Sequence, residues 1–290
     1  MNFSVYEAGK KVNPAHLPIG AGVEDTAVFE SLRTYGAAIF REEEHLDRLT
    51  ESARTAGISM RYSRADLRRE LRLAAGAFRR ESGLPASEDL FFRLTLDPNK
   101  LYVLAGIRRH APEIYEKGVV LRTTSVRRPL VNASAPQAKT GAYQTALLAA
   151  VEPGAGAYES LFLDVDGYVA EVSIGNLFIV KGGLLKTPPA QGILNGVTRR
   201  FVIECVLPGR LRLEETYFTR HDVFNADEVF LTNTSWEILP VREVDGRAAG
   251  ARIPGPWTLK IHRLFKAKVA EECRKLKSSA PSSASRTKRD

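Results

Sequence analysis

Residues 160–187 read SLFLDVDGYVAEVSIGNLFIVKGGLLKT, a run of short apolar segments separated by turn residues. Asp166-Gly167 and Gly182-Gly183 lie between apolar segments, and both pairs are typical of tight β-hairpins. We therefore expect four strands in close succession, at residues 160–164, 168–172, 176–180 and 184–187. This succession of hairpins distinguishes the second part of the chain from the first.

The first part of the chain alternates strand-like and helix-like segments. Strands are expected at 26–35, 90–96 and 101–107, and helices at 42–56 and 64–80. The first helix opens with three acidic residues, whose charge suits a helix N-terminus. This pattern predicts a small α/β domain over residues 1–115.

The second part predicts a larger domain over residues 116–276. Besides the hairpins, strands are expected at 119–125, 228–231 and 238–244, and helices after Lys139, at 195–207 and at 260–276. The fold class is therefore α/β. Residues 277–290 are rich in Ser, Ala and basic residues without an apolar period, so we expect a disordered basic tail.

The composition is that of an ordinary globular protein, with 290 residues, 44% hydrophobic and 26% charged. The net charge is +8, and residues 274–290 hold six basic residues against one acid. Such a tail could bind nucleic acid or an anionic membrane, but a solvated end is the simpler interpretation, and we expect neither partner. The N-terminus lacks the apolar segment of a signal peptide, and Cys205 and Cys273 look like reduced thiols, so a cytoplasmic protein is expected.

Lys139 stands directly before an apolar segment with helical spacing. The apolar residues Tyr143, Ala146, Leu147, Ala150 and Val151 form one face of that expected helix, with Thr140 as its N-cap. A lysine at a helix N-terminus has a lowered pKa, more so if it is buried. Imine chemistry needs such a partly neutral amine. A surface lysine in a loop is the alternative, and these residues alone favour it.

A second candidate is GILNGVTRRFVIE, residues 192–204. A helix begins after Gly196, and the free N–H groups of Val197 and Thr198, with the Thr198 hydroxyl, could bind a phosphate. Simple capping of the helix by Asn195 or Thr198 explains the same residues equally well.

Two further stretches bear polar groups among apolar strands. Glu171 lies inside an expected strand, either facing solvent or buried with a partner such as a protonated ring nitrogen. The cluster TNTS at 232–235 directly follows a strand, where it forms either a site or an ordinary turn. The five histidines are scattered, so no metal site is expected. An amine, an anion cradle, a carboxylate and hydroxyls are together the groups that a pyridoxal phosphate site needs.

Five motifs resemble the class IV (fold type IV) pyridoxal-phosphate enzymes, which include branched-chain aminotransferases and 4-amino-4-deoxychorismate lyase. They are VFESLRTYGAAIFREEEHLDRL, AKTGAYQTALLAAVE, DGYVAEVSIGNLFIVKGGLLKTPP, GILNGVTRRFVIE and DEVFLTNTSWEILPVREVDG. Their order matches the family from about residue 27 to 276. The resemblance implies two domains, the larger with a barrel-like sheet and helices, with pyridoxal 5'-phosphate between them, and a homodimer.

The resemblance also implies roles for individual residues. Lys139 would form a Schiff base with the cofactor and move protons at the substrate α-carbon. Glu171 would bond the pyridine nitrogen, and Arg48 would bind the phosphate. Val197, Thr198 and Thr234 would add donors to the phosphate, and Tyr143 would lie near the lysine. Arg33 and Arg93 would bind the substrate carboxylate, with Ser31 and Asn233 nearby.

Some residues depart from the branched-chain pattern. Ser31 replaces a glycine in FESLR, Glu24 stands where a pocket tyrosine is usual, and Lys139 precedes Tyr143 by one residue fewer than usual. Asn233 resembles the lyase branch. We therefore expect a branched-chain aminotransferase-like enzyme that moves an amino group between an amino acid and a 2-keto acid, with the lyase as the alternative. A degenerate protein that is non-catalytic or binds nucleic acid, suggested by the missing tyrosine and the basic tail, is a third, less favoured interpretation.

Overall fold

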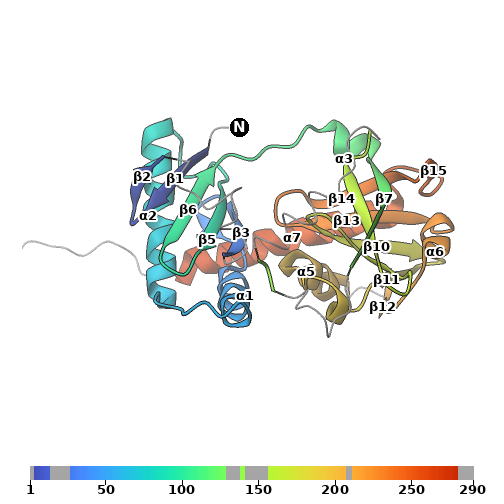
Figure 1. Ribbon diagram of the computed structural model, residues 1–290. Coiled ribbons are helices and arrows are strands. Elements are labelled where there is room, and N and C mark those ends of the chain that lie inside the picture. Colours follow the sequence, from blue (N-terminus) through green and yellow to red (C-terminus); the bar gives the residue numbers. More distant parts are fainter. Residues whose placement is uncertain (1–2, 14–26, 129–137, 141–155, 207–210, 280–290) are drawn as a thin grey trace, which may run out of the picture.

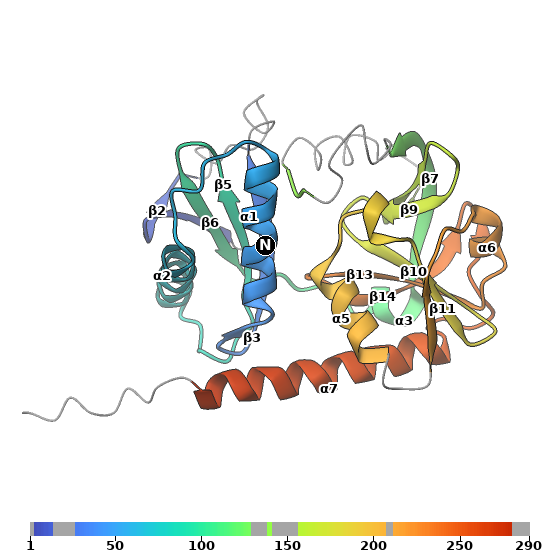
Figure 2. The same cartoon turned by 90° about the horizontal axis from the view of Figure 1, so that it is seen from below.

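The computed structural model describes residues 3–13, 27–128, 138–140, 156–206 and 211–279 (Figure 1). These residues form two sheets, each with its own helices. One long C-terminal helix runs alongside both of them (Figure 2).

The first sheet is antiparallel, with the strand order β2-β1-β6-β5-β3-β4. Its strands are β1 (Phe3–Glu7), β2 (Lys10–Val12), β3 (Val28–Tyr35), β4 (Ala38–Ile39), β5 (Phe91–Leu96) and β6 (Leu101–Gly106). Helices α1 (Glu42–Thr55) and α2 (Arg64–Ser82) pack against one face, where Leu32, Leu46 and Leu94 are fully buried. Because side chains alternate along a strand, Phe29 and Arg93 project from the other face.

The local sequence explains where the two helices begin. Three acids occupy the first turn of α1, where they stabilise the N-terminal dipole. Helix α2 begins with a capping box between Ser63 and Asp66, and it ends at Gly83, whose φ of 64° suits a glycine cap.

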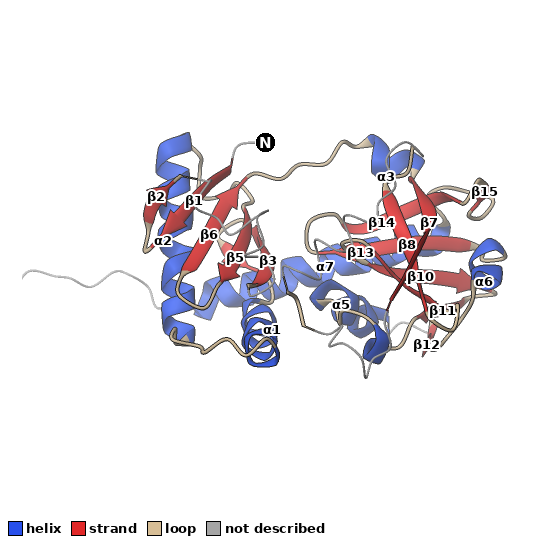
Figure 3. Ribbon diagram, in the orientation of Figure 1, coloured by secondary structure: helices blue, strands red, loops and turns tan. Residues whose placement is uncertain are grey.

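The second sheet has nine strands, in the order β12-β11-β10-β13-β14-β7-β8-β9 with β15 paired to β14 (Figure 3). They are β7 (Val119–Arg128), β8 (Glu159–Asp164), β9 (Val169–Val172), β10 (Asn176–Lys181), β11 (Leu184–Thr187), β12 (Arg212–Glu215), β13 (Glu228–Asn233), β14 (Glu237–Val244) and β15 (Arg247–Ala248). Strand β7 runs parallel to β14 and β8, and β11 runs parallel to β12. The sheet curls, because β9 at one end of this order also contacts β10. The mixed architecture confirms the predicted α/β class.

The helices of this second part are α3 (Glu113–Lys117), the 3-10 turn η3 (Ala190–Gly192), α5 (Val197–Val206), α6 (Arg220–Phe224) and α7 (Pro256–Ser279). An aromatic cluster joins the two parts of the chain. The ring of Phe40, which follows β4, lies 4.8 Å from Phe201 of α5, and Phe201 lies 5.2 Å from Phe265 of α7. These edge-to-face contacts join α5 and α7 to the first part of the chain.

Most predicted elements are present, with ends shifted by a few residues. The strand predicted at 184–187 is confirmed in full, and the closing helix predicted at 260–276 runs from Pro256 to Ser279. The disordered tail was predicted to begin at residue 277, but residues 277–279 are helical and continue α7. Strands β1 and β2 were not predicted. The predicted helix after Lys139, residue Tyr143 and residue Glu24 all lie outside the described residues.

The strands of the first sheet all precede residue 115, and those of the second all follow it. The boundary between residues 115 and 116 itself stays a prediction.

Candidate active site

A cavity of about 370 Å³ lies between the two sheets. This volume is within the range of small-molecule sites, roughly 300–1,000 Å³. The first part of the chain contributes Phe3, Phe29, Ser31, Arg48, Phe91, Arg93, Leu104 and Arg108 to its walls. The rest of the chain contributes Lys139, residues 171–176, Leu194, residues 196–198 and residues 232–235.

Lys139 is held at the cavity by its own backbone. Its N–H donates to Ser52 Oγ at 2.9 Å, its carbonyl accepts from the Phe29 N–H at 3.0 Å, and Thr140 forms a bridge with Val28. The segment thus extends the edge of β3, and the Lys139 amine lies 4.9 Å from the centre of the Phe29 ring. Burial, with the charges of Arg48 and Arg93, lowers the pKa of Lys139 to about 8, although Glu30 acts in the opposite direction. The expected lowering of this pKa is present, with burial as its cause.

Arg48 reaches the cavity from α1 and is oriented by the buried Glu30 of β3. Arg48 Nε donates to Glu30 Oε1 at 2.6 Å and Nη2 donates to Oε2 at 2.8 Å, while His45 Nδ1 lies 2.8 Å from Oε2. Burial alone would raise the pKa of Glu30, but Arg48 and Lys139 hold it well below its usual range. The third nitrogen, Nη1, donates to the Asn195 carbonyl at 3.0 Å. Arg48 is thereby placed beside the start of α5.

The start of α5 lies opposite Arg48, and the two form one corner of the cavity. Val197 and Thr198 begin the helix, so their N–H groups have no partner within it. Gly196 is required here, because a Cβ at this position would lie 2.2 Å from Asn176 Oδ1. Asn176 in turn donates to the Leu194 carbonyl at 2.8 Å. A guanidinium and a helix N-terminus in one corner form an anion-binding arrangement.

Glu171 of β9 is buried and lines the cavity. Its carboxylate pairs with Arg128 and accepts from the Asn176 side chain at 3.3 Å and from the Leu194 N–H at 3.2 Å. Burial raises the pKa of Glu171 to about 7, although Arg128 and the Leu194 N–H act in the opposite direction. The acid is therefore buried with partners, and the alternative of a solvent-facing glutamate is excluded.

Two guanidinium groups stack on phenyl rings along the first sheet. Arg93 lies 3.9 Å from the centre of the Phe29 ring, and Arg108 lies 4.8 Å from that of Phe91. Arg93 pairs in register with Ser31, so both side chains leave the same face of the sheet. Burial lowers the pKa of Arg108. This wall therefore combines apolar rings with two positive charges.

The loop between β13 and β14 forms part of the cavity wall. Asn233 Oδ1 accepts from the N–H groups of Ser235 and Trp236, both at 2.8 Å, and Asn233 Nδ2 donates to the Ile174 carbonyl at 3.1 Å. The Asn233 side chain therefore holds the loop in place, while Thr234 and Ser235 line the cavity.

Nine of the eleven candidates from the sequence line this cavity: Lys139, Arg48, Glu171, Val197, Thr198, Thr234, Ser31, Arg93 and Asn233. Arg33 does not line it, and Tyr143 lies outside the described residues. Sequence reasoning missed Arg108, Asn176 and Gly196. The close approach of Gly196 to Asn176 had only one indication in the sequence, which is that the glycine stands directly before a helix.

Two further candidate classes receive no support within the described ranges. There, no three His, Cys, Asp or Glu side chains gather as metal ligands would. Among the same residues, no helix has both the length and the apolar character needed to cross a membrane.

Comparison with known proteins agrees with this geometry. The family model for amino-transferase class IV matches residues 27–244. The chain is 37% identical to a branched-chain-amino-acid aminotransferase of Pseudomonas aeruginosa over 82% of each chain. It is 33% identical to that of Escherichia coli over 83% of each.

Solved structures give the same result. The Escherichia coli branched-chain amino acid aminotransferase matches with a TM-score of 0.76 at 28% identity, covering 91% of this chain and 93% of the other. The T.th. branched-chain amino acid aminotransferase, solved with pyridoxamine 5'-phosphate, matches with a TM-score of 0.78 at 26% identity, covering 95% and 96%. These relatives share the predicted fold, and they favour an aminotransferase over the lyase alternative.

Proposed function

The chain belongs to the amino-transferase class IV family and is a pyridoxal-phosphate-dependent transaminase. We propose that Lys139 is the amine that binds the cofactor in this enzyme. One observation carries the proposal: a primary amine lines the cavity with its pKa lowered to about 8. A neutral amine is the nucleophile that a carbonyl requires, and it is also a base suited to proton transfer near neutral pH.

The cavity fits the cofactor on observations that do not depend on the family. Its corner between Arg48 and the start of α5 offers a guanidinium and free N–H groups to a phosphate, and Gly196 keeps that corner open. Glu171 lies at another part of the cavity, buried and able to accept a proton. We assign Arg48, Val197, Thr198 and Thr234 to the phosphate and Glu171 to the ring nitrogen. Tyr143 stays a prediction from the resemblance.

Pyridoxal phosphate, when bound, supplies a carbonyl carbon that an amine can attack and a ring that stabilises negative charge at the substrate α-carbon. Lys139 Nζ would hold the cofactor covalently and, once displaced by the substrate amine, would take up the proton from the α-carbon. Glu171 would keep a proton at the ring nitrogen, which favours that proton transfer. Arg128, by pairing with Glu171, orients its carboxylate.

The wall of the first sheet supports recognition of amino acids with apolar side chains. Phe3, Phe29, Phe91 and Leu104 offer an apolar surface, while Arg93 and Arg108 offer positive charge to carboxylates. Because the relatives are named for branched-chain amino acids, we propose such amino acids and their 2-keto acids as substrates. Asn233, the residue that resembled the lyase branch, is engaged in holding its loop and gives the lyase no support.

We also propose a homodimer in the cytoplasm. The exposed apolar side chains of Tyr168 and Tyr217, with ring centres 5.3 Å apart, and of Val165 support a contact between copies of the chain. Cys205 and Cys273 are both buried and form no disulfide, which supports a reducing compartment.

The test is a screen of amino donors against the purified enzyme loaded with pyridoxal phosphate. Branched-chain amino acids should convert the absorbance of the pyridoxal form into that of the pyridoxamine form, and a 2-keto acid should restore it. The absence of conversion across a panel of L- and D-amino acids would contradict transamination by this site. Formation of pyruvate from aminodeoxychorismate would instead favour the lyase.

A further inference from the structure

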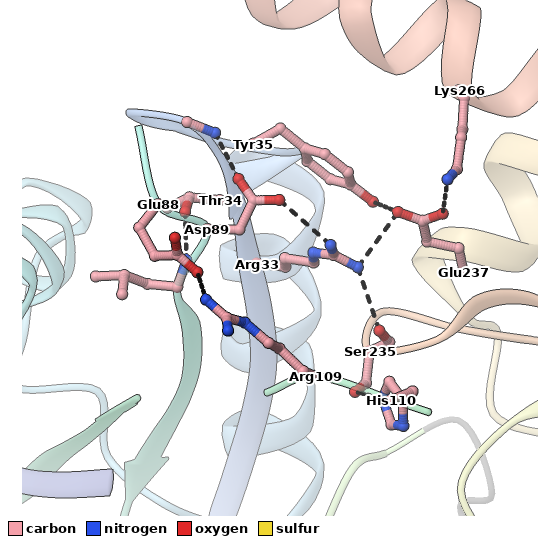
Figure 4. A network of polar contacts seen from close by, with 12 residues as sticks. Arg33, Thr34, Tyr35, Glu88, Asp89, Arg109, His110, Ser235, Glu237 and Lys266 are labelled. Atoms are coloured by element: carbon pink, nitrogen blue, oxygen red, sulfur yellow. Dashed lines mark hydrogen bonds and ion pairs between the residues drawn. The ribbon is translucent and has the colours of Figure 1, made fainter. Parts of the chain in front are cut away.

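Arg33, predicted to bind substrate, makes a different set of contacts. Its guanidinium lies between two carboxylates, with Nη2 3.3 Å from Asp89 Oδ2 and Nη1 3.2 Å from Glu237 Oε1 (Figure 4). It also stacks 4.9 Å from the centre of the Tyr35 ring. Two neighbouring carboxylates already neutralise its charge, so Arg33 is poorly suited to bind a third one from a substrate.

Glu237 is the centre of these contacts. It opens β14, is 6% exposed and has a φ of 64°, an uncommon backbone conformation for a glutamate. Besides Arg33, its carboxylate accepts from the Tyr35 hydroxyl at 2.9 Å and lies 2.9 Å from His262 Nε2 of α7. A single buried carboxylate thus connects the first sheet, the second sheet and the long helix.

The same contacts extend to the wall of the cavity. Arg33 Nη1 donates to the Ser235 carbonyl at 3.3 Å, and His110 Nε2 lies 2.7 Å from Ser235 Oγ. Ser235 and its neighbour Thr234 line the cavity, whereas Arg33 does not. Arg33 therefore lies outside the candidate site, where it connects Glu237 to a loop that lines the site.

We propose that Arg33 is a positioning residue which, held by Glu237, fixes the loop at residues 233–236 against the first sheet and thereby sets the width of the substrate cavity. The proposal rests on the proposed function only in taking this cavity as the substrate site. Loop residues Thr234 and Ser235 connect two strands of the second sheet, whereas Arg93 and Arg108 belong to the first part of the chain. A substrate that contacts both walls would bind well only when their separation is fixed, because a site that is not preorganised loses affinity.

Arg41 provides a matched control. It also joins the first part of the chain to the rest, through Glu204 of α5 and Glu272 of α7, both at 2.7 Å. Its side chain is 18% exposed, close to the 24% of Arg33. Arg41 contacts no loop of the cavity in these ion pairs, so its loss should affect stability alone.

The experiment compares Arg33→Ala, Glu237→Gln and Arg41→Ala in the full-length enzyme. Each is measured for melting temperature and for KM and kcat with an amino donor. Tryptophan emission is recorded in a Trp257→Phe background, where Trp236 of the loop is the only tryptophan of the chain. Trp236 is 2% exposed, so a loosened loop should shift its emission to longer wavelength.

We expect Arg33→Ala and Glu237→Gln to raise KM by about tenfold or more, the effect of losing one charge-assisted hydrogen bond, and to shift the Trp236 emission. Arg41→Ala should lower the melting temperature while KM and emission stay unchanged. If all three variants lower the melting temperature alone, Arg33 has only a structural role and the proposal is overturned.

A second outcome would overturn the proposal differently. If Arg33→Ala raises KM while Glu237→Gln leaves it unchanged or lowers it, Arg33 binds the substrate directly. A wild-type enzyme that converts no donor would contradict the proposed function instead, and the Trp236 emission would still decide whether Arg33 holds the loop.

Discussion

Arg48 and Glu30 form a buried two-point ion pair, with Nε–Oε1 and Nη2–Oε2 distances of 2.6 and 2.8 Å. The pair uses two of the five N–H donors of Arg48 and a third, on Nη1, donates to the Asn195 carbonyl, so two N–H groups remain for a ligand beside the start of α5. A fully buried carboxylate beneath the phosphate corner therefore serves to orient the cation that would bind the phosphate.

The first prediction concerns this pair. Glu30→Gln leaves the Arg48 charge buried without its partner, which should lower the free energy of unfolding by roughly 3 kcal/mol and weaken pyridoxal phosphate binding. Denaturant unfolding and cofactor titration measure the two effects. Glu81→Gln, which removes an exposed partner of Lys11, is the control and should change neither. Normal cofactor affinity in Glu30→Gln would show that Arg48 needs no such support.

The second prediction concerns the corner at Gly196. Gly196→Ala places a Cβ 2.2 Å from Asn176 Oδ1, so the Asn176 side chain must move and its bonds to Glu171 and Leu194 are disturbed. We expect cofactor affinity to fall by about tenfold or more, the loss that follows when one charge-assisted hydrogen bond is disturbed. The matched control is Gly192→Ala, because a Cβ there meets no atom within 4 Å. Equal affinities of the two variants would contradict the close packing at residue 196.

The third prediction concerns pH. With a pKa of about 8, Lys139 is neutral in about one molecule in eleven at pH 7, against roughly one in three thousand for an ordinary lysine. The rate of cofactor capture by the apoenzyme should therefore rise about tenfold per pH unit below pH 8 and level off above it. Stopped-flow absorbance measures this rate. A rate that keeps rising to pH 10 would mean that the amine is not perturbed.

The same pKa predicts a stability effect in the apoenzyme. The folded-state pKa lies below the ordinary value of 10.5, so the unfolded chain binds more protons between about pH 8 and 10.5. Stability should then rise with pH in this window. Lys139→Met should remove this rise, whereas replacement of the exposed Lys181 should retain it.

The fourth prediction concerns the wall of the first sheet. Arg108→Ala removes a guanidinium from the cavity and should raise KM for amino-acid donors by about tenfold or more. Its neighbour Arg109 is bound to Glu88 at 2.6 Å and does not line the cavity, so Arg109→Ala should leave KM unchanged. Equal KM values for the two variants would exclude Arg108 from substrate recognition.

Most residues that the sequence offered as candidates line the cavity. Val197 and Thr198 could be named because they begin a helix after a glycine, whereas local patterns alone favoured a surface lysine at Lys139, and the family resemblance assigned the roles of Lys139 and Glu171. Burial, the largest cause of the lowered lysine pKa, was anticipated from the sequence. The charges of Arg48 and Arg93, which add to it, could not be predicted in this way, because they reach Lys139 only through the packing of the first sheet.

Arg33 shows where the pattern was insufficient. Phe29, Ser31 and Arg33 alternate along β3 and share one face, so all three could be expected at the same site. The strand passes beyond the cavity before it reaches Arg33, and there Glu237 of a distant strand is its neighbour. Only the tertiary structure, which brings the start of β14 to Arg33, reveals this contact.

The N-terminal hairpin was missed for a local reason. Ala8 and Gly9 form its two-residue turn with φ values of 48° and 72°. Such a turn usually carries Asn or Asp at its first position, because alanine seldom adopts a positive φ. The pair therefore gave no hairpin signal, and β2, with only three residues, was too short to show a period.

The most direct test of the proposed chemistry is to find which lysine holds the cofactor. The enzyme loaded with pyridoxal phosphate is treated with borohydride, which makes the bond between the lysine and the cofactor permanent, and the labelled peptide is identified by mass spectrometry. We predict a label on Lys139 that is lost in Lys139→Ala and retained in Lys181→Ala. A label on any other lysine, or none on a protein that binds the cofactor, would contradict the assignment of Lys139 as the central amine.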